Sequence, residues 1–172
     1  MTHTLPSADE REAALYERLA ALGIAWKTYE HVPVFTVAEA DEVHAQVPGG
    51  HTKNLFLKDK KDGLWLIVVR DRLRVDLNAL ARQLGAPRFS FGSAELLIAT
   101  LGIEPGSVTP FALMNDPAHR VKPILDEGML ALDPLNFHPL RNDRTTAIAP
   151  DALMRFIGDC GHQPLTVALP EK

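Results

Sequence analysis

Apolar residues recur at helical spacing in several short stretches, each bounded by residues that start or stop a helix. Ser7 and Glu10 form a capping box ahead of three leucines, because their hydroxyl and carboxylate can satisfy the first free amides of a helix. Gly23 follows as a natural C-terminal stop. The same signals predict four more helices, over 36–45, 76–84, 93–101 and 151–157.

Continuous and alternating apolar runs predict the strands. Leu64–Val69 is a continuous apolar run, which is typical of a buried strand, and a polar loop separates it from a strand over 53–58. Shorter strands are predicted over 25–31, 121–125, 129–132 and 145–148, and a loop over 136–142. Because strands and helices mix without a regular βαβ alternation, we expect a mixed α/β or α+β domain with a partly antiparallel sheet.

Length and composition narrow the class of protein. The 172 residues suit one domain with a sizeable core, and the single cysteine excludes a disulfide-held scaffold and a cysteine-rich zinc site. No apolar run approaches the ~20 residues of a membrane span. The start of the chain lacks the pattern of a secretory signal, so we expect a cytoplasmic protein. The net charge of −4 argues against bulk coating of nucleic acid and permits a local basic groove.

Metal and thiol chemistry have weak support in the sequence. No two of the seven histidines are four residues apart, as a helical zinc motif requires, so we expect no metal and no cofactor. Cys160 is a possible nucleophile, but His162, two residues on, would not face it on a helix. A thiol-dependent hydrolase therefore stays as an alternative.

Three positions combine polar chemistry with an unusual context. Lys53 begins an otherwise apolar strand, where its side chain either meets solvent at an edge or projects into a cavity. The segment Gly106–Pro110 is either a plain turn or a backbone loop whose free amides approach a ligand. His138 stands in a loop before a proline, either at the surface or in a pocket.

Basic residues cluster after the second strand of the hairpin. Arg70, Arg72 and Arg74 alternate, so on a strand they would share one face. That face is either a solvated edge that discourages strand pairing or a small strip that contacts phosphates.

Three motifs occur together in a fixed order: His51–Asp59, Gly106–Leu113 and Phe137–Asn142. Because it carries these motifs, the chain resembles the YbaK and prolyl-tRNA-synthetase-associated domain family. The resemblance implies one domain over 1–172, with a core of about 15–162. The resemblance implies a mixed α/β fold with a curved sheet flanked by helices. It also implies hydrolysis, in trans, of the ester between a wrong amino acid and the 3′ end of proline tRNA. Alanine is the expected amino acid. The alternatives are cysteine, or a non-catalytic module that binds tRNA or a synthetase.

The resemblance also assigns residues and partners. The catalytic candidates are Lys53, Gly106 and His138. The expected substrate-binding residues are Ser107, Pro110, Asn54, Phe35, Thr36 and His31. Phe35, Thr36 and Phe111 are expected as pocket walls, and Glu30 as a further pocket residue. The expected partner is the acceptor end of mischarged proline tRNA, with prolyl-tRNA synthetase as a second partner.

Hydrolysis of this ester requires no strong protein nucleophile. An aminoacyl ester is already activated, so a positioned water and a stabilised oxyanion suffice. Lys53 could hold a phosphate or the developing charge, and the Gly106 and Ser107 amides could donate to the ester carbonyl. His138 could bind the substrate or fix that loop, and the terminal 2′-hydroxyl could assist the water.

Overall fold

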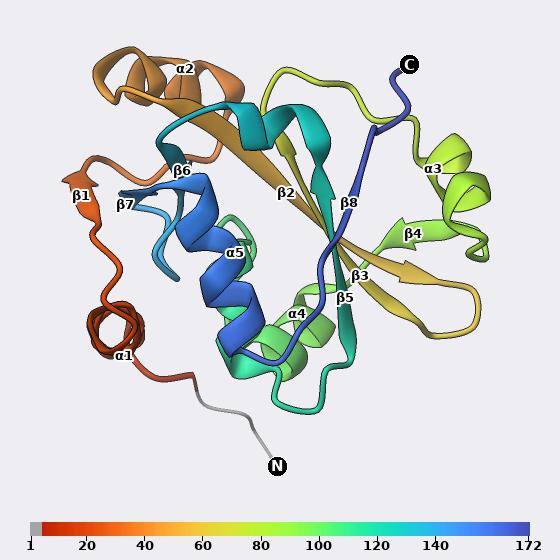
Figure 1. The fold of residues 1–172 in the computed structure, drawn as a ribbon, viewed down its shortest axis with the longest axis horizontal. Coiled ribbons are helices and arrows are strands. Elements are labelled where there is room, and N and C mark those ends of the chain that lie inside the picture. Colours follow the sequence, from red (N-terminus) through yellow and green to blue (C-terminus); the bar gives the residue numbers. More distant parts are fainter. Residues whose placement is uncertain (1–4) are drawn as a thin grey trace.

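A mixed sheet of eight strands runs through the structure, a computed structural model that describes residues 5–172 (Figure 1). The strands are β1 (Lys27–Glu30), β2 (Gly50–Asp59), β3 (Leu64–Arg70), β4 (Phe89–Phe91), β5 (Val121–Asp126), β6 (Leu135–Phe137), β7 (Arg144–Ile148) and β8 (Leu165–Val167). Their order is β1-β7-β6-β2-β3-β5-β8, with β4 paired to β2. The β1–β7, β2–β3, β2–β4 and β6–β7 pairs are antiparallel, and the β2–β6, β3–β5 and β5–β8 pairs are parallel. The expected mixed α/β fold, partly antiparallel, is confirmed.

Helices begin where the capping residues predict. They are α1 (Ala8–Ala21), α2 (Val37–Gln46), α3 (Leu77–Leu84), α4 (Ala94–Leu101), α5 (Pro150–Asp159) and the 3-10 helices η1 (Pro110–Asn115) and η2 (Glu127–Ala131). The side chains of Ser7, Thr36 and Asp76 each accept a hydrogen bond from the amide three residues on. No helix within residues 5–172 is both long and apolar enough to cross a membrane.

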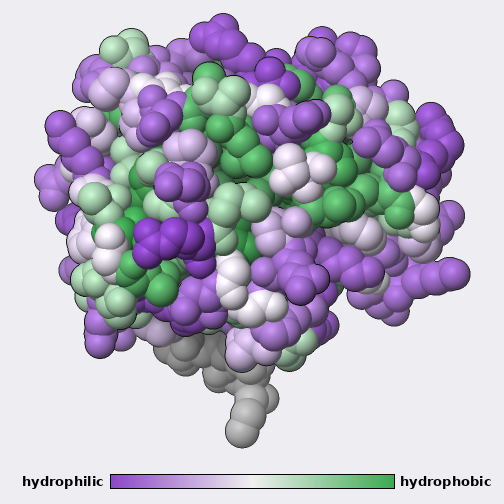
Figure 2. Space-filling view, in the orientation of Figure 1, coloured by the Kyte–Doolittle hydropathy of each residue, from purple (hydrophilic) through white to green (hydrophobic). Residues whose placement is uncertain are grey.

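Helices pack on both faces of the sheet. On one face α1, α4, α5 and η1 bury a large core in which Phe111 packs edge-on against Phe137 and Phe156, at ring-centroid distances of 5.6 and 5.4 Å. On the other face α3 covers a smaller core that includes Trp65 and Leu80. In the same view, Figure 2 shows polar side chains around the outline of the molecule and apolar ones across its middle.

Two sequence predictions of local structure are wrong. The segment Met129–Leu132, expected as a strand, lies mostly in η2, because Asp126 caps this turn by accepting a hydrogen bond from the Gly128 amide at 3.1 Å. The expected loop over 136–142 begins later, since Asn136 and Phe137 form part of β6. The sequence reading also missed β4 and β8, which have three residues each and are too short to show a period.

Candidate functional site

A cavity of about 510 Å³ opens between α2 and the ends of β2 and β3. The segment between β1 and α2 closes one side, and the loop between β6 and β7 closes another. Its lining residues are His31, Val34, Val37, Ala40, Asp41, Val43, His44, Thr52, Lys53, Asp71, Arg72, His138 and Thr145. The cavity thus joins three of the residues predicted from the sequence, namely Lys53, His138 and His31.

Lys53 lines this cavity, which is one of the two alternatives that the sequence left open. Its backbone lies in the β2–β3 ladder opposite Val69, so the strand pairing fixes where the side chain begins. Within residues 5–172 no carboxylate lies within 4.0 Å of the Lys53 ammonium group. The charge is therefore available to an anionic group of a ligand.

His138 presents a hydrogen-bond acceptor to the cavity. Its Nδ1–H donates to the main-chain oxygen of Arg144 at 3.0 Å, which leaves the lone pair on Nε2. Burial lowers the pKa of the imidazole, outweighing the Arg144 hydrogen bond that raises it. The ring is therefore neutral at neutral pH and can accept a proton or a hydrogen bond at Nε2.

His31 stands across from His138, with their ring centroids 6.4 Å apart. Its Nδ1–H donates to the Val32 oxygen at 2.7 Å, and its Nε2 accepts from the Thr145 hydroxyl at 2.8 Å. Because both ring nitrogens are occupied, His31 shapes the wall with a fixed ring orientation.

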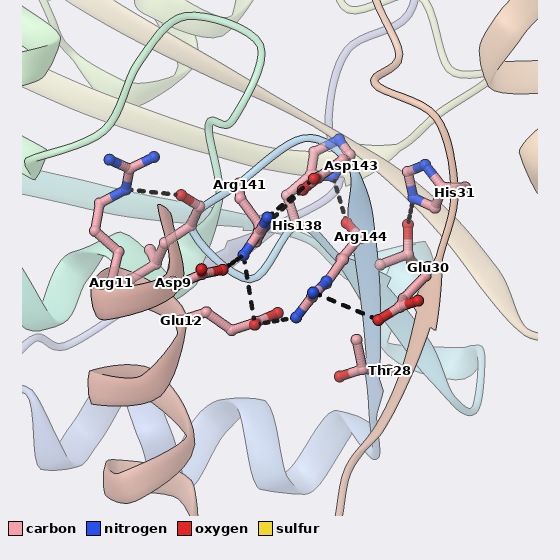
Figure 3. A network of polar contacts seen from close by, with 12 residues as sticks. Asp9, Arg11, Glu12, Thr28, Glu30, His31, His138, Arg141, Asp143 and Arg144 are labelled. Carbon is pink, nitrogen blue, oxygen red and sulfur yellow. Dashed lines mark hydrogen bonds and ion pairs between the residues drawn. The ribbon is translucent and has the colours of Figure 1, made fainter. Parts of the chain in front are cut away.

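A polar network between α1 and the β6–β7 loop holds the two histidines in place (Figure 3). Buried Glu12 of α1 binds the guanidinium groups of Arg141 and Arg144, and Arg141 also pairs with Asp143 at 2.6 Å. The main-chain oxygen of Asp143 in turn accepts a hydrogen bond from the His31 amide at 3.0 Å. The residues that bind the histidines directly, Asp143 and Arg144, follow the third motif, and Glu12 of α1, far from the motifs in sequence, holds Arg144 in turn.

Asn54 lines a smaller cavity of about 40 Å³ that shares His44, Thr52, His138 and Thr145 with the larger one. Its Oδ1 is buried and has no hydrogen-bond partner within residues 5–172. The Oδ1 of Asn136, on the same cavity, also has no hydrogen-bond partner within residues 5–172, while its Nδ2 donates to the main-chain oxygens of Pro48 and Gly50. Sequence reasoning found Asn54 through its motif and missed Asn136, which was expected in a loop.

The Gly106–Pro110 segment lies outside the cavity lining. Gly106 is exposed and has a φ of 90°, which favours glycine. The expectation of free amides at both Gly106 and Ser107 is wrong for Ser107, whose N–H donates to the Glu104 oxygen at 3.1 Å to close the turn. Ser107 and Pro110 are the buried residues of this loop, so they shape it from the interior of the protein.

Phe35 and Thr36 also lie outside the lining, although their neighbours Val34 and Val37 are part of it. The Thr36 hydroxyl caps α2 by accepting a hydrogen bond from the Glu39 amide at 3.2 Å. The Phe35 side chain is 73% exposed. The expectation that these two residues form the pocket walls is therefore wrong for this structure, and the valines beside them take that place.

The family follows from comparison with known proteins. The aminoacyl-tRNA editing domain model matches residues 31–156, which include β2, the Gly106 loop and His138. The chain belongs to the aminoacyl-tRNA editing domain family. This confirms the resemblance drawn from the three sequence motifs.

Relatives of this editing domain match it over nearly their whole length. The bovine prolyl-tRNA synthetase associated domain-containing protein 1 is 38% identical over 161 residues, which cover 91% of this chain and 94% of the relative. The prolyl-tRNA editing protein ProX of Acetoanaerobium sticklandii is 28% identical over 149 residues, covering 86% and 91%. A crystal structure of a protein proposed to be a trans-editing enzyme for prolyl-tRNA synthetase has a TM-score of 0.70 at 21% identity, covering 98% and 100%. That similarity shows that the two proteins share a fold.

The arginines of the editing domain do not form the strip that their spacing suggested. β3 ends at Arg70, so Arg72 and Arg74 leave the strand and share no face with it. Arg70 pairs with buried Asp126 at 2.7 Å. Only Arg72 of the three lines the cavity.

Cys160 lies apart from the cavity at the end of α5. It is buried, and desolvation raises the pKa of its thiol to about 11. Such a thiol carries very little thiolate at neutral pH. The three-residue clusters of histidine, cysteine and carboxylate that hold a metal are absent from residues 5–172.

Proposed function

We propose that this editing domain hydrolyses, in trans, the ester bond of mischarged proline tRNA, with alanine as the amino acid released. One observation carries the proposal. The ammonium group of Lys53, which has no carboxylate partner within residues 5–172, and the neutral ring of His138 line one cavity in a chain of the editing family. The ProX relative supports a prolyl-tRNA substrate. We also propose that the acceptor end is the part bound, with prolyl-tRNA synthetase as a second partner.

Editing is needed for amino acids that are smaller than proline, for a physical reason. A pocket shaped for proline rejects a smaller side chain by only ~1–3 kcal/mol for each lost methylene, and a second hydrolytic site is the usual remedy. Alanine and cysteine both fit this description. Alanine is our proposal, and cysteine is the outcome that the assay below must separate from it.

The lining residues supply what ester hydrolysis needs. The water oxygen bonds to the carbonyl carbon, the bond from that carbon to the ribose oxygen breaks, and the ribose oxygen takes up a proton. The Lys53 ammonium group stabilises the negative charge that develops on the carbonyl oxygen. The Nε2 of His138 accepts a hydrogen bond from the water or the substrate amine, and the terminal 2′-hydroxyl assists proton transfer. This is one of the two roles expected of Lys53 from the sequence, and the Ser107 amide, which is already bonded, takes no part in it.

The test is a deacylation assay with proline tRNA charged in turn with alanine, cysteine or proline. We expect fast release of alanine, slower release of cysteine and no release of proline above the uncatalysed rate. Faster release of cysteine would replace alanine in the proposal. If none of the three amino acids is released while the tRNA still binds, the protein is a binding module and the enzymatic proposal is wrong.

A further inference from the structure

The rim of the large cavity carries an exposed aromatic ring and a guanidinium group that pairs with no carboxylate within residues 5–172, and neither is used by the chemistry above. We propose that this rim binds the 3′-terminal nucleotide of the tRNA, with Phe35 stacking on the terminal base and Arg72 contacting a phosphate. This inference rests on the proposed function, because it describes how the same substrate is held outside the cavity.

Exposed apolar side chains gather on the segment that closes the cavity. Of the five large apolar residues that are exposed within residues 5–172, two lie on this segment, Val32 and Phe35, and a third, Val37, is the first residue of α2 directly after it. Exposed apolar groups gathered on one rim of a cavity mark a contact surface more often than isolated ones do. Val34 of the segment and Val37 of α2 also line the cavity, so this surface is continuous with the cavity.

The Phe35 ring has one supported side and one open side. A Cβ atom placed on Gly106 would lie 3.8 Å from Phe35 Cε1, so the ring rests near the Gly106 backbone. The rest of the side chain meets solvent, since 73% of it is exposed. An aromatic ring with a free face is the arrangement on which an unpaired base stacks. Gly106, which the sequence analysis placed in the site, thus lies beside this ring.

The geometry of the substrate directs its base to this rim. The ester and the terminal base are attached to the same ribose, so when the aminoacyl group occupies the cavity the base lies at its mouth. Phe35 adjoins the lining residue Val34, and adjacent Cα atoms are only about 3.8 Å apart. The ring is therefore within reach of a base on that ribose.

Arg72 supplies the charge that a nucleotide requires. Its side chain lines the cavity and is exposed, and no carboxylate within residues 5–172 lies within 4.0 Å of its guanidinium group. The backbone just before it is fixed, because the Asp71 amide donates to the His51 oxygen at 3.0 Å. A guanidinium group held at such a rim suits a phosphate, which it can bind through two parallel hydrogen bonds.

An aromatic face beside a free guanidinium favours a nucleic-acid end over a protein partner. Stacking accepts any base, and the cation contacts the backbone, so the two together recognise a single-stranded terminus without reading its sequence. A second copy of the chain or another protein could also cover Phe35, and the experiments separate these cases.

The aromatic half of the proposal is tested with a tRNA acceptor-stem hairpin that ends in a single-stranded 3′ tail. The hairpin is alanylated and carries either the normal terminal adenine or an abasic terminal ribose. Phe35→Ala is expected to raise KM about tenfold on the normal hairpin, within the range for base stacking, and to leave KM unchanged on the abasic one. Phe35→Trp should retain wild-type KM. The matched control is Phe91→Ala, because Phe91 is 68% exposed on β4 and lies outside the cavity lining.

The cationic half is tested by the salt dependence of binding of the uncharged hairpin. One phosphate contact on a single strand contributes about 0.7 to the slope of log Kd against log salt. Arg72→Gln is expected to lower that slope by about this amount. Arg74→Gln is the control, since Arg74 is exposed on the same loop and lies outside the lining.

The outcomes distinguish this inference from the proposed function. If the wild-type protein releases no alanine, the proposed function fails, while hairpin binding still reports on the rim. If the wild-type protein releases alanine but Phe35→Ala and Arg72→Gln match their controls, the inference alone is wrong. An equal rise in KM on the normal and abasic hairpins would overturn stacking. Loss of self-association in Phe35→Ala, with unchanged hairpin binding, would assign the ring to a contact between copies.

Discussion

His138 donates its Nδ1–H to the main-chain oxygen of Arg144 at 3.0 Å, and this bond decides which ring nitrogen faces the cavity. The donor sits in the loop after β6, and the acceptor is the first residue of β7. The closure of one short loop thereby fixes the tautomer of the ring, with Nε2 left as an acceptor.

The pH dependence of deacylation should follow the protonation of His138. Burial lowers the pKa of this group below its ordinary value of about 6.5. Protonation removes the lone pair on Nε2, so the rate should fall as the pH drops through that lowered pKa and stay constant above it. A profile of kcat/KM between pH 4.5 and 8 measures this. Replacing His138 with alanine should lower kcat about a hundredfold or more and abolish the acidic limb.

Lys53→Ala is a useful comparison in the same experiment. A lysine variant that lowers the rate but keeps the acidic limb would confirm that the limb belongs to His138. An acidic limb that persists unchanged in His138→Ala would contradict its assignment to this ring.

The Lys53 ammonium group should contribute to rate and little to stability. It has no carboxylate partner within residues 5–172, so its removal breaks no ion pair of the fold. Lys53→Ala is expected to lower kcat by about 10²–10³-fold, the range for losing one group that stabilises an oxyanion, while the melting temperature stays within about 2 °C of wild type. Deacylation kinetics and thermal unfolding measure the two effects.

Lys58→Ala provides the matched control for Lys53. Lys58 lies on the same strand, pairs with exposed Asp62 at 3.2 Å and lies outside the cavity lining. We expect wild-type kinetics from this variant. Equal losses of rate in the two variants would show that charge anywhere on β2 matters, which contradicts a specific role for Lys53.

The sequence predicted those features whose causes are local. Ser7, Thr36 and Asp76 cap helices because a side chain bonds to an amide three residues away. The β2–β3 hairpin was predictable because an apolar run follows a short polar loop. Two motif residues named from the sequence, Lys53 on a strand and His138 before a proline, line one cavity, and their roles stay predictions.

The remaining features depend on contacts between distant segments. As a large apolar residue, Phe35 fits the expected composition of a pocket wall. The turn into α2 instead places its neighbours in the cavity lining and leaves the Phe35 ring outside that lining. Arg70, Arg72 and Arg74 have strand spacing, but buried Asp126 binds Arg70 at the point where β3 ends. Asp126 is far from Arg70 in sequence, and the cavity that Val34 and Val37 line is completed by distant residues of β2 and β7, so no local pattern could indicate these outcomes.

Cys160 should be dispensable for catalysis. It lies at the end of α5, outside the cavity lining, and burial raises the pKa of its thiol to about 11. Cys160→Ser is expected to retain the wild-type deacylation rate, although burying a hydroxyl there should lower the free energy of unfolding by about 1 kcal/mol. A rate reduced in proportion to thiol alkylation of the folded wild-type protein would instead restore the thiol-dependent mechanism.

Glu12 should act on the site from α1 without touching the substrate. It is buried and binds both Arg141 and Arg144, and Arg144 also provides the oxygen that fixes His138. Glu12→Gln keeps the shape of the side chain but removes its charge, leaving two arginines close together. We expect the free energy of unfolding to fall by about 2 kcal/mol, given the remaining pairs of Arg141. We also expect kcat to fall several-fold with little change in KM.

Denaturant unfolding and deacylation kinetics on one preparation separate these effects. Glu17→Gln is the control, since Glu17 is exposed on the same helix, and it should change neither quantity. If Glu12→Gln only destabilised the protein, its rate per folded molecule would equal that of wild type well below the melting temperature. A lower rate there, together with a shifted acidic limb in the pH profile, would identify Glu12 as a positioning residue that acts through the Arg144 oxygen on the ring of His138.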